Sequence, residues 1–181
     1  MANKPLRTKK AVRTKKAVRT NKPARPAKKR RGLLHFKTFG ERGAWVEMLF
    51  ITAAMFYGFR CLKPCGEYFA YDVAIEIPGG MLRIQVKSTT FRYGAGYLCE
   101  FTHGRQGRNR RYNPGELDLC VAYVIPKKVW YIIPARKVTG RHGKAAITLC
   151  QPKTCRNKPK YEQYREAWRL LKKNREQLLS L

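Results

Sequence analysis

Residues 81–89 alternate apolar and polar side chains, and this pattern limits the fold of the chain more than any other segment does. A strand places successive side chains on opposite faces, so the apolar residues would share one face and the polar residues the other. The apolar set is Leu82, Ile84 and Val86, and the polar set is Arg83, Gln85 and Lys87. Residues 71–77 have the composition of a second strand, and a Pro-Gly-Gly turn separates the two. The sequence therefore predicts an antiparallel hairpin over residues 71–89.

The remaining elements expected from the sequence are helices at both ends of the folded region and further strands between them. A helical pattern opens at 40–43 and stops at Gly58, and its expected apolar face comprises Trp45, Met48, Leu49, Thr52, Ala53 and Phe56. Strands are predicted at 97–101, 117–125, 129–133 and, as a short edge strand, 147–150, with Trp130 and Tyr131 in the core. Residues 161–181 have the spacing of an amphipathic helix, with one face formed by Tyr161, Tyr164, Trp168, Leu171 and Leu178. This order predicts an α/β layered domain.

Residues 1–31 differ in character from the rest of the chain. They contain 14 Lys or Arg and no acid, and the unit Arg-Thr-Lys-Lys-Ala-Val occurs twice, at 7–12 and 13–18. Such a segment buries too little apolar surface to offset the entropy of ordering it. We therefore expect a disordered tail over 1–31 and a folded domain over 32–181. The tail is expected either to contact phosphates without sequence specificity or only to aid solubility, and its last basic run is Lys28, Lys29, Arg30 and Arg31.

The charge of the chain favours a polyanionic partner. The 40 Lys and Arg residues outnumber the 11 Asp and Glu, which gives a formal net charge of +29. Nucleic acid is therefore the leading class of partner. An anionic membrane is the rival, but no apolar run approaches the roughly 20 residues that span a bilayer, and the basic start lacks the features of a secretory signal. We expect an intracellular protein, cytoplasmic and associated with a bacterial nucleoid.

The hairpin carries the residues with the clearest chemical use. Asp72 on the first strand would lie near Gln85 and Lys87 on the second. Carboxylate and amide oxygens suit a hard cation such as Mg²⁺, and a lysine ammonium can orient an attacking water and steady a phosphate. Glu47 on the first helix is a further acid that could reach this cluster. The alternative is that the polar face of the hairpin is simply its solvated side.

The order of these residues resembles the PD-(D/E)XK nuclease superfamily and, within it, the group I intron-associated homing endonucleases. The resemblance covers roughly residues 38–170 and rests on Gly43-x3-Glu47, Gly66, Tyr71-Asp72-Val73, Gln85-x-Lys87 and the stretches 62–64, 82–89, 123–126 and 130–134. It implies a restriction-endonuclease-like core, in which a mixed sheet of about four strands is flanked by helices. It also implies Mg²⁺-dependent hydrolysis of double-stranded DNA.

The resemblance implies a role for each residue of the cluster. Asp72 matches the metal-binding aspartate, Lys87 the motif lysine and Glu47 the acid of the first helix. Gln85 stands where the family usually has an acid; it supplies one neutral oxygen, so metal affinity should fall. Tyr71 replaces the usual proline before the aspartate. Glu41 is the alternative to Glu47, but it lies roughly one and a half turns earlier, on another face of the helix.

Other residues are candidates for DNA contact or for the rim of the site. Ser88 and Thr89 continue the strand that carries Lys87 and either touch DNA or pair across the sheet. The loop at 102–115 is expected to clamp phosphates or enter a groove, unless it is only a solvated basic segment. Its arginines are Arg105, Arg108, Arg110 and Arg111. Asp118 is either a rim residue or, as we favour, a turn-capping carboxylate.

Two functions follow from these observations. The first is a homing-type or site-specific endonuclease that uses Mg²⁺. The second is a catalytically weak or inactive nuclease-fold protein that binds DNA or RNA. The intact set of Asp72, Gln85 and Lys87 favours the enzyme, because a protein that only binds DNA has no use for it. A duplex has two strands and one site cuts only one of them, so we expect a homo-oligomer, either a dimer or a tetramer.

Overall fold

The computed structural model describes residues 36–66, 68–103, 110–139, 146–152 and 159–181. The predicted tail over 1–31 therefore lies outside the described residues. Along the chain the structure has helix α1 (Phe39–Phe56) and strands β1 (Cys61–Leu62), β2 (Val73–Ile77), β3 (Gly80–Thr89), β4 (Arg92–Tyr93), β5 (Gly96–Glu100), β6 (Leu119–Val124), β7 (Val129–Pro134) and β8 (Ala146–Leu149). Short 3-10 helices flank β7, namely η1 (Ile125–Lys127) and η2 (Ala135–Lys137). The C-terminal part contains η3 (Glu162–Tyr164), η4 (Trp168–Lys172) and α2 (Arg175–Leu179).

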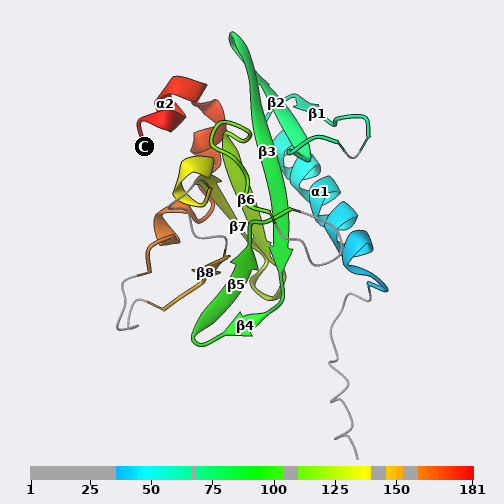
Figure 1. Cartoon of the computed structure of the whole chain (residues 1–181), viewed down its shortest axis with the longest axis vertical. Coiled ribbons are helices and arrows are strands. Elements are labelled where there is room, and N and C mark those ends of the chain that lie inside the picture. Colours follow the sequence, from blue (N-terminus) through cyan, green and yellow to red (C-terminus); the bar gives the residue numbers. More distant parts are fainter. Residues whose placement is uncertain (1–35, 67, 104–109, 140–145, 153–158) are drawn as a thin grey trace, which may run out of the picture. The chain divides into compact units, whose positions relative to one another are not determined.

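A mixed sheet with strand order β1-β2-β3-β6-β7 forms the centre of the described domain (Figure 1). β3 and β6 are parallel, and the other neighbours are antiparallel. The predicted hairpin is confirmed, because β2 pairs with β3 from Val73 opposite Ile84 to Ile77 opposite Gly80. The sheet has one strand more than expected, since the two residues of β1 add to the edge at β2. A run of two residues has no periodicity from which a strand could be predicted.

The remaining strands form a second sheet with the strand order β4-β5-β8. The segment predicted at 147–150 is confirmed as an edge strand, because β8 pairs with β5 alone among the described strands. β4 and β5 belong to the connection that carries the chain from β3 to the parallel strand β6. Such a connection is needed because parallel neighbours cannot be joined by a tight turn.

Local residues determine where helix α1 begins and where it ends. The Thr38 hydroxyl accepts a hydrogen bond from the Glu41 N–H at 3.0 Å, which caps the first turn. Gly58 follows the helix with φ of 83°, a conformation that favours glycine and stops the helix. The buried residues of the helix are Val46, Phe50 and Ala54.

The predicted apolar face of α1 is wrong, because the buried face is rotated about the helix axis relative to the predicted one. Met48 and Phe56 were expected to be buried but are 54% and 87% exposed. Trp45, Leu49 and Ala53 are partly buried at the border of the core. The error has a simple cause: α1 is apolar on nearly every side, so periodicity alone could not identify the side that faces the sheet.

Strands β6 and β7 form the core of the domain, since every residue in them is buried. Tyr123 and Trp130 face α1, with ring centroids 6.1 Å from Trp45 and 5.6 Å from Phe50, respectively. Tyr131 points to the opposite face of the sheet, where its hydroxyl donates to Glu162 at 2.6 Å. The prediction that Trp130 and Tyr131 belong to the core is confirmed. The sheet is therefore covered on both faces, as in other α/β layered domains.

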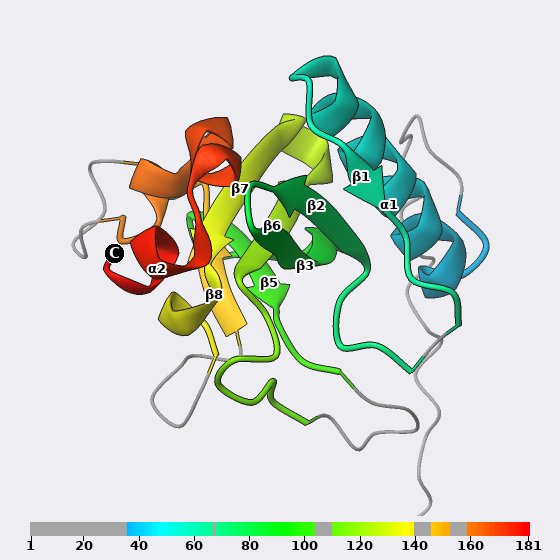
Figure 2. The same ribbon diagram turned by 90° about the horizontal axis from the view of Figure 1, so that it is seen from above.

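The single amphipathic helix predicted over 161–181 is wrong, although its apolar residues are buried as expected. The segment consists of η3, η4 and the five-residue α2, and it runs beside β7 and β8 (Figure 2). The helix is interrupted at Glu166, which has φ of 48°. Its N–H donates to the Trp130 carbonyl at 2.9 Å, and its carboxylate accepts the Trp130 N–H at 2.7 Å. These bonds pair backbone groups at the free edge of β7. This tertiary pairing outweighs the preference for a continuous helix that the apolar spacing indicates.

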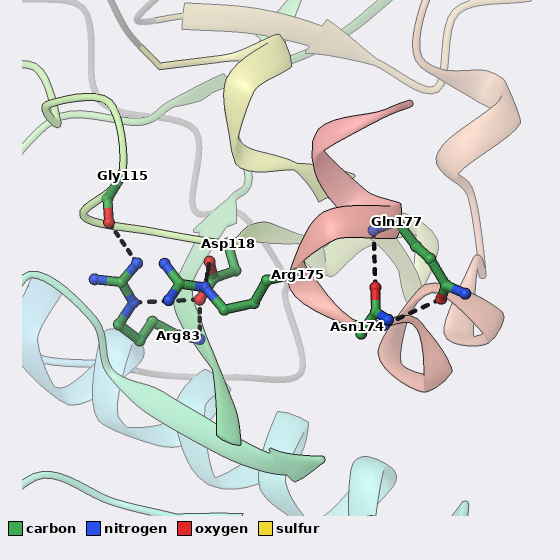
Figure 3. Close-up of polar contacts among 6 residues, drawn as sticks. All are labelled: Arg83, Gly115, Asp118, Asn174, Arg175 and Gln177. Atoms are coloured by element: carbon green, nitrogen blue, oxygen red, sulfur yellow. Dashed lines mark hydrogen bonds and ion pairs between the residues drawn. The ribbon is translucent and has the colours of Figure 1, made fainter. Parts of the chain in front are cut away.

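Asp118 connects three parts of the fold rather than capping a turn or lining the site (Figure 3). One carboxylate oxygen accepts the backbone N–H of Arg83 at 2.8 Å and its Nε at 3.2 Å. The other accepts Nε of Arg175, the first residue of α2, at 2.8 Å. The Arg83 guanidinium also donates to the Gly115 carbonyl. The Asp118 side chain is only 8% exposed, so this contact fixes β3, β6 and the C-terminal segment to one another.

Candidate active site

A cleft of about 200 Å³ lies between the N-terminal half of α1 and the C-terminal half of β3. It brings together the four side chains to which the sequence assigned the chemistry, namely Glu47, Asp72, Gln85 and Lys87. Glu47 comes from the helix and Asp72 from the residue before β2. Gln85 and Lys87 come from β3, two residues apart on the same side of the strand.

Asp72 is fixed to β3 by hydrogen bonds from both its backbone and its side chain. Its N–H donates to the Ile84 carbonyl at 2.9 Å. One carboxylate oxygen, Oδ2, accepts the Val86 N–H at 2.8 Å and also the side-chain amide of Gln85. Gln85 is only 5% exposed. The alternative that this face is the solvated side of the hairpin is therefore wrong, because a solvated face would leave Gln85 in water.

Burial and charge determine the protonation of Asp72. Burial is the largest influence, and together with the nearby Glu47 carboxylate it raises the pKa of Asp72 to about 6. The Val86 N–H and the ammonium groups of Lys87 and Lys63 favour the charged form and oppose this rise. Asp72 is thus a poorly solvated carboxylate whose charge a bound cation would stabilise.

Glu47 is engaged in an ion pair that the sequence did not indicate. Its carboxylate lies 2.7 Å from Nζ of Lys63, a residue just after β1. The ion pair orients the Glu47 carboxylate next to Asp72 without burying an isolated charge. Glu41, the alternative helix acid, does not line the cleft; it accepts the Lys37 N–H at 2.7 Å and is part of the N-terminal cap of α1. The choice of Glu47 over Glu41 agrees with this placement.

The two residues after Lys87 have different surroundings. Ser88 lines the cleft beside Lys87. Thr89 is 4% exposed, and its hydroxyl donates to the Leu98 carbonyl and accepts the Phe91 N–H at 3.0 Å. These bonds fix the turn that leaves β3. The predicted DNA contact of Thr89 is therefore corrected to a structural role, whereas that of Ser88 stays a prediction.

The arginine-rich segment is only partly described. Arg105 and Arg108 lie outside the described residues. Arg110 and Arg111 are exposed, and the backbone of Arg110 exchanges two hydrogen bonds with His103, at 2.7 and 2.9 Å. Tyr112 turns inward and stacks on the His103 ring, with centroids 4.7 Å apart. Burial and the Asp72 charge raise the pKa of Tyr112.

Sequence reasoning missed Arg42, which lines the cleft from α1. Its guanidinium lies over the Phe39 ring, 5.1 Å from the centroid, and Phe39 also lines the cleft. Nothing in the sequence singles out Arg42, because it is one of 40 Lys and Arg residues. Only the fold places it in the same cleft as Lys87.

Two absences can be stated for the described part of the chain. None of its helices has the length and apolarity that crossing a membrane requires. It also contains no group of three or more His, Cys, Asp or Glu side chains arranged to hold a metal ion. The cleft offers two carboxylates and one amide instead, which are oxygen donors suited to a hard cation.

Comparison with known proteins agrees with this geometry. The model of the PD-(D/E)XK endonuclease family matches residues 38–171, a range that includes the whole cleft. Among solved structures, the bacterial homing endonuclease I-Ssp6803I is similar, with a TM-score of 0.64 and 28% sequence identity, over 75% of this chain and 93% of that chain. No match is found among curated proteins. The resemblance to the homing-type branch is thereby confirmed, and this chain belongs to the PD-(D/E)XK endonuclease family.

Proposed function

We propose that this chain is a Mg²⁺-dependent, homing-type endonuclease that hydrolyses phosphodiester bonds of double-stranded DNA. The observation that carries the proposal is the convergence of Glu47, Asp72, Gln85 and Lys87 on one open cleft. The four residues come from three separate segments of the chain. Their order in the sequence is the order that the family motif requires.

The donor atoms of the cleft fit a divalent cation. Asp72 Oδ2 is occupied by the Val86 N–H and by the Gln85 amide nitrogen. Asp72 Oδ1 and Gln85 Oε1 accept no hydrogen bond from any residue that the structure describes, so each has lone pairs to offer. Mg²⁺ is commonly held by one or two protein oxygens, with waters and a phosphate completing its shell. When bound, the cation would polarise the phosphate and lower the pKa of a coordinated water.

The residues of the chain then have distinct tasks in hydrolysis. Asp72 is kept rigid by the backbone of β3, so its free oxygen has a fixed position. Lys87 provides a positive charge in the same cleft, where negative charge builds up on the phosphate oxygens. The water oxygen forms a bond to phosphorus and gives up a proton to Glu47, while the bond from phosphorus to the deoxyribose oxygen breaks and that oxygen takes a proton from solvent water. Glu47, oriented by Lys63, is placed to accept a hydrogen bond from the attacking water.

Gln85 is expected to give the site a lower affinity for metal than an acid at this position would. Its amide is neutral, so the cleft has one negative charge fewer than in family members with an acid at this place. The amide nitrogen compensates locally, because it donates to Asp72 and holds the carboxylate in place. We expect millimolar rather than micromolar Mg²⁺ to support full activity.

A plasmid library with randomised inserts tests the proposal. The purified full-length protein is incubated with the supercoiled library in Mg²⁺, in Ca²⁺ and in EDTA, and the new DNA ends are sequenced. The expected result is cutting in Mg²⁺ only, at a restricted set of sequences. Retention of DNA by the protein without cutting in Mg²⁺ or Mn²⁺ would replace the enzyme with the alternative, a nuclease-fold protein that only binds DNA.

A further inference from the structure

Arg42 lines the cleft with a guanidinium whose buried Nε has no hydrogen-bond partner among the described residues. It lies in the first turns of α1, one residue before Gly43 and five before Glu47. Its guanidinium makes a ring contact with Phe39, but it forms no hydrogen bond or ion pair with any described residue. The Nε atom is buried and, within the described ranges, has no hydrogen-bond partner. A buried donor left without an acceptor is costly, so such a group in a native protein calls for an explanation.

The two acids that line the cleft together with Arg42 are already engaged. Glu47 is paired with Lys63 at 2.7 Å, and one oxygen of Asp72 accepts two hydrogen bonds from β3. Lys87 partly balances the remaining charge of Asp72. The protein therefore brings a second cation into the cleft beyond what its own carboxylates need. An anion that enters the cleft would meet Arg42 on the α1 side and Lys87 on the β3 side.

The cleft is open on the α1 side, next to Arg42. Gly43 also lines the cleft, and a Cβ atom added there would meet no other atom within 4 Å. Ser88 lines the cleft from β3, next to Lys87. A guanidinium is planar and presents several N–H donors, which match the non-bridging oxygens of a phosphodiester better than an ammonium does. The Phe39 ring limits the directions that the guanidinium can take.

We propose that Arg42 binds the phosphodiester that is cut and holds it against Asp72 and Lys87, with Phe39 as a positioning residue for the guanidinium. The inference rests on the proposed endonuclease function and extends it, because it identifies the residue that contacts the substrate from α1. It also explains why a cation without a carboxylate partner among the described residues is kept in this cleft.

The first test compares Arg42→Met, Arg42→Lys and the control Arg60→Met. Arg60 carries the same charge but lies outside the cleft, in an exposed pair with Glu76. Arg42→Met is expected to lower kcat/KM for the mapped duplex by about 10- to 100-fold, the usual range for a hydrogen bond to a charged group. Arg42→Lys should recover part of this loss, and Arg60→Met should change kcat/KM by less than about twofold. Wild-type kcat/KM in Arg42→Met would overturn the inference.

The second test separates phosphate contact from a merely structural role. A duplex with a neutral methylphosphonate at the cut position is bound in Ca²⁺ by the wild type and by Arg42→Met. If Arg42 contacts this phosphate, the drop in affinity caused by Arg42→Met on the normal duplex disappears on the neutral one. An equal drop on both duplexes would contradict the contact. If the wild type binds DNA but never cuts it, the proposed hydrolysis fails, and the Kd values of Arg42→Met and Arg60→Met still decide whether Arg42 contacts DNA.

Discussion

The Asp72 carboxylate shows how a single residue can be held firmly and yet be poorly solvated. The hydrogen bonds from Val86 and Gln85 fix its orientation, while burial and Glu47 disfavour its charge. An unperturbed aspartate has a pKa of about 3.9, and that of Asp72 is raised to about 6. A bound cation would relieve this unfavourable state of the carboxylate.

The first prediction concerns the stability of Asp72→Asn without metal. Because the folded pKa lies above the unfolded one, ionisation of Asp72 opposes folding. The penalty is absent below about pH 4, grows as the pH rises to about 6, and is constant above that. Asparagine keeps the acceptor for Val86 and removes the charge, so the variant should be more stable at pH 7.5 by up to about 3 kcal/mol and equal to wild type near pH 4. Thermal unfolding across this range measures the difference.

The control for this prediction is Glu76→Gln, an exposed acid on β2 that lies outside the cleft. It should show no comparable gain at pH 7.5. Addition of Mg²⁺ should stabilise the wild type more than Asp72→Asn, because the substitution removes the carboxylate expected to hold the cation. A variant less stable than wild type at pH 7.5 would show that the carboxylate charge does not oppose folding.

The sequence was sufficient to identify residues with a recognisable spacing but not those defined by the fold. Gln85 and Lys87 are two apart on an alternating strand, so they could be assigned to one face. Arg42 has no such signal among so many cations, and its importance depends on where the first turns of α1 meet β3. The sequence left the role of Thr89 open between DNA contact and pairing in the sheet, because the turn after β3, which uses its hydroxyl, cannot be seen in the strand pattern.

At the scale of elements, β3 is the strand on which the site depends, and its position is set from outside the cleft. It pairs with β2 on one side and β6 on the other, and Arg83 ties it to Asp118. Alternation predicted this strand well because one rule, period 2, governs its whole length. The C-terminal segment could not be predicted in the same way. Its apolar spacing fits a helix, but Glu166 bonds to the edge of β7 instead.

The second prediction concerns Asp118→Ala. The substitution removes the acceptor for the Arg83 backbone N–H and the carboxylate with which Arg83 and Arg175 form ion pairs. It should destabilise the protein by about 2–4 kcal/mol, as is usual when one partner of a buried network is deleted. Arg175→Ala is the control, because Arg175 is 52% exposed and its removal should cost less than about 1 kcal/mol. Urea unfolding measures both, and equal destabilisation by the two substitutions would contradict a central role for Asp118.

At the scale of the whole molecule, charge is the dominant property. The chain has a net charge of +29, and 14 of its Lys and Arg lie in residues 1–31. A field of this size attracts polyanions and speeds association with them, but it opposes the association of two copies of the chain. The tail is therefore proposed to act on DNA affinity, and the cleft is proposed to carry out the hydrolysis.

The third prediction concerns deletion of residues 1–31. Lys and Arg side chains that bind phosphates release condensed counterions from DNA, and this release drives binding. Without the 14 cations of the tail, the protein should bind duplex DNA more weakly, with a shallower dependence of log Kd on log salt, and should still cut in Mg²⁺. Fluorescence anisotropy at several salt concentrations measures the slope. An unchanged slope would show that the tail does not engage DNA.

The fourth prediction is that the form bound to DNA is a homo-oligomer, at least a dimer. One Asp72–Lys87 cleft serves one phosphodiester at a time, whereas a double-strand cut needs two. Two-fold related subunits would present two identical clefts to the two strands. Light scattering with and without the mapped duplex measures the state. A monomer in both conditions, combined with nicked products, would identify a nickase instead.

The fifth prediction addresses the central claim, that the cleft around Asp72 is where DNA is hydrolysed with the help of a metal. The measurement is the rate of Mg²⁺-dependent cutting of the plasmid library by wild type, Asp72→Asn and Glu76→Gln. Since Asp72→Asn is expected to fold at least as stably as wild type, a drop in its activity cannot be ascribed to unfolding. We predict that it cuts at least about 100-fold more slowly, while Glu76→Gln retains the wild-type rate and both still bind DNA. Cutting by Asp72→Asn at the wild-type rate would contradict the account.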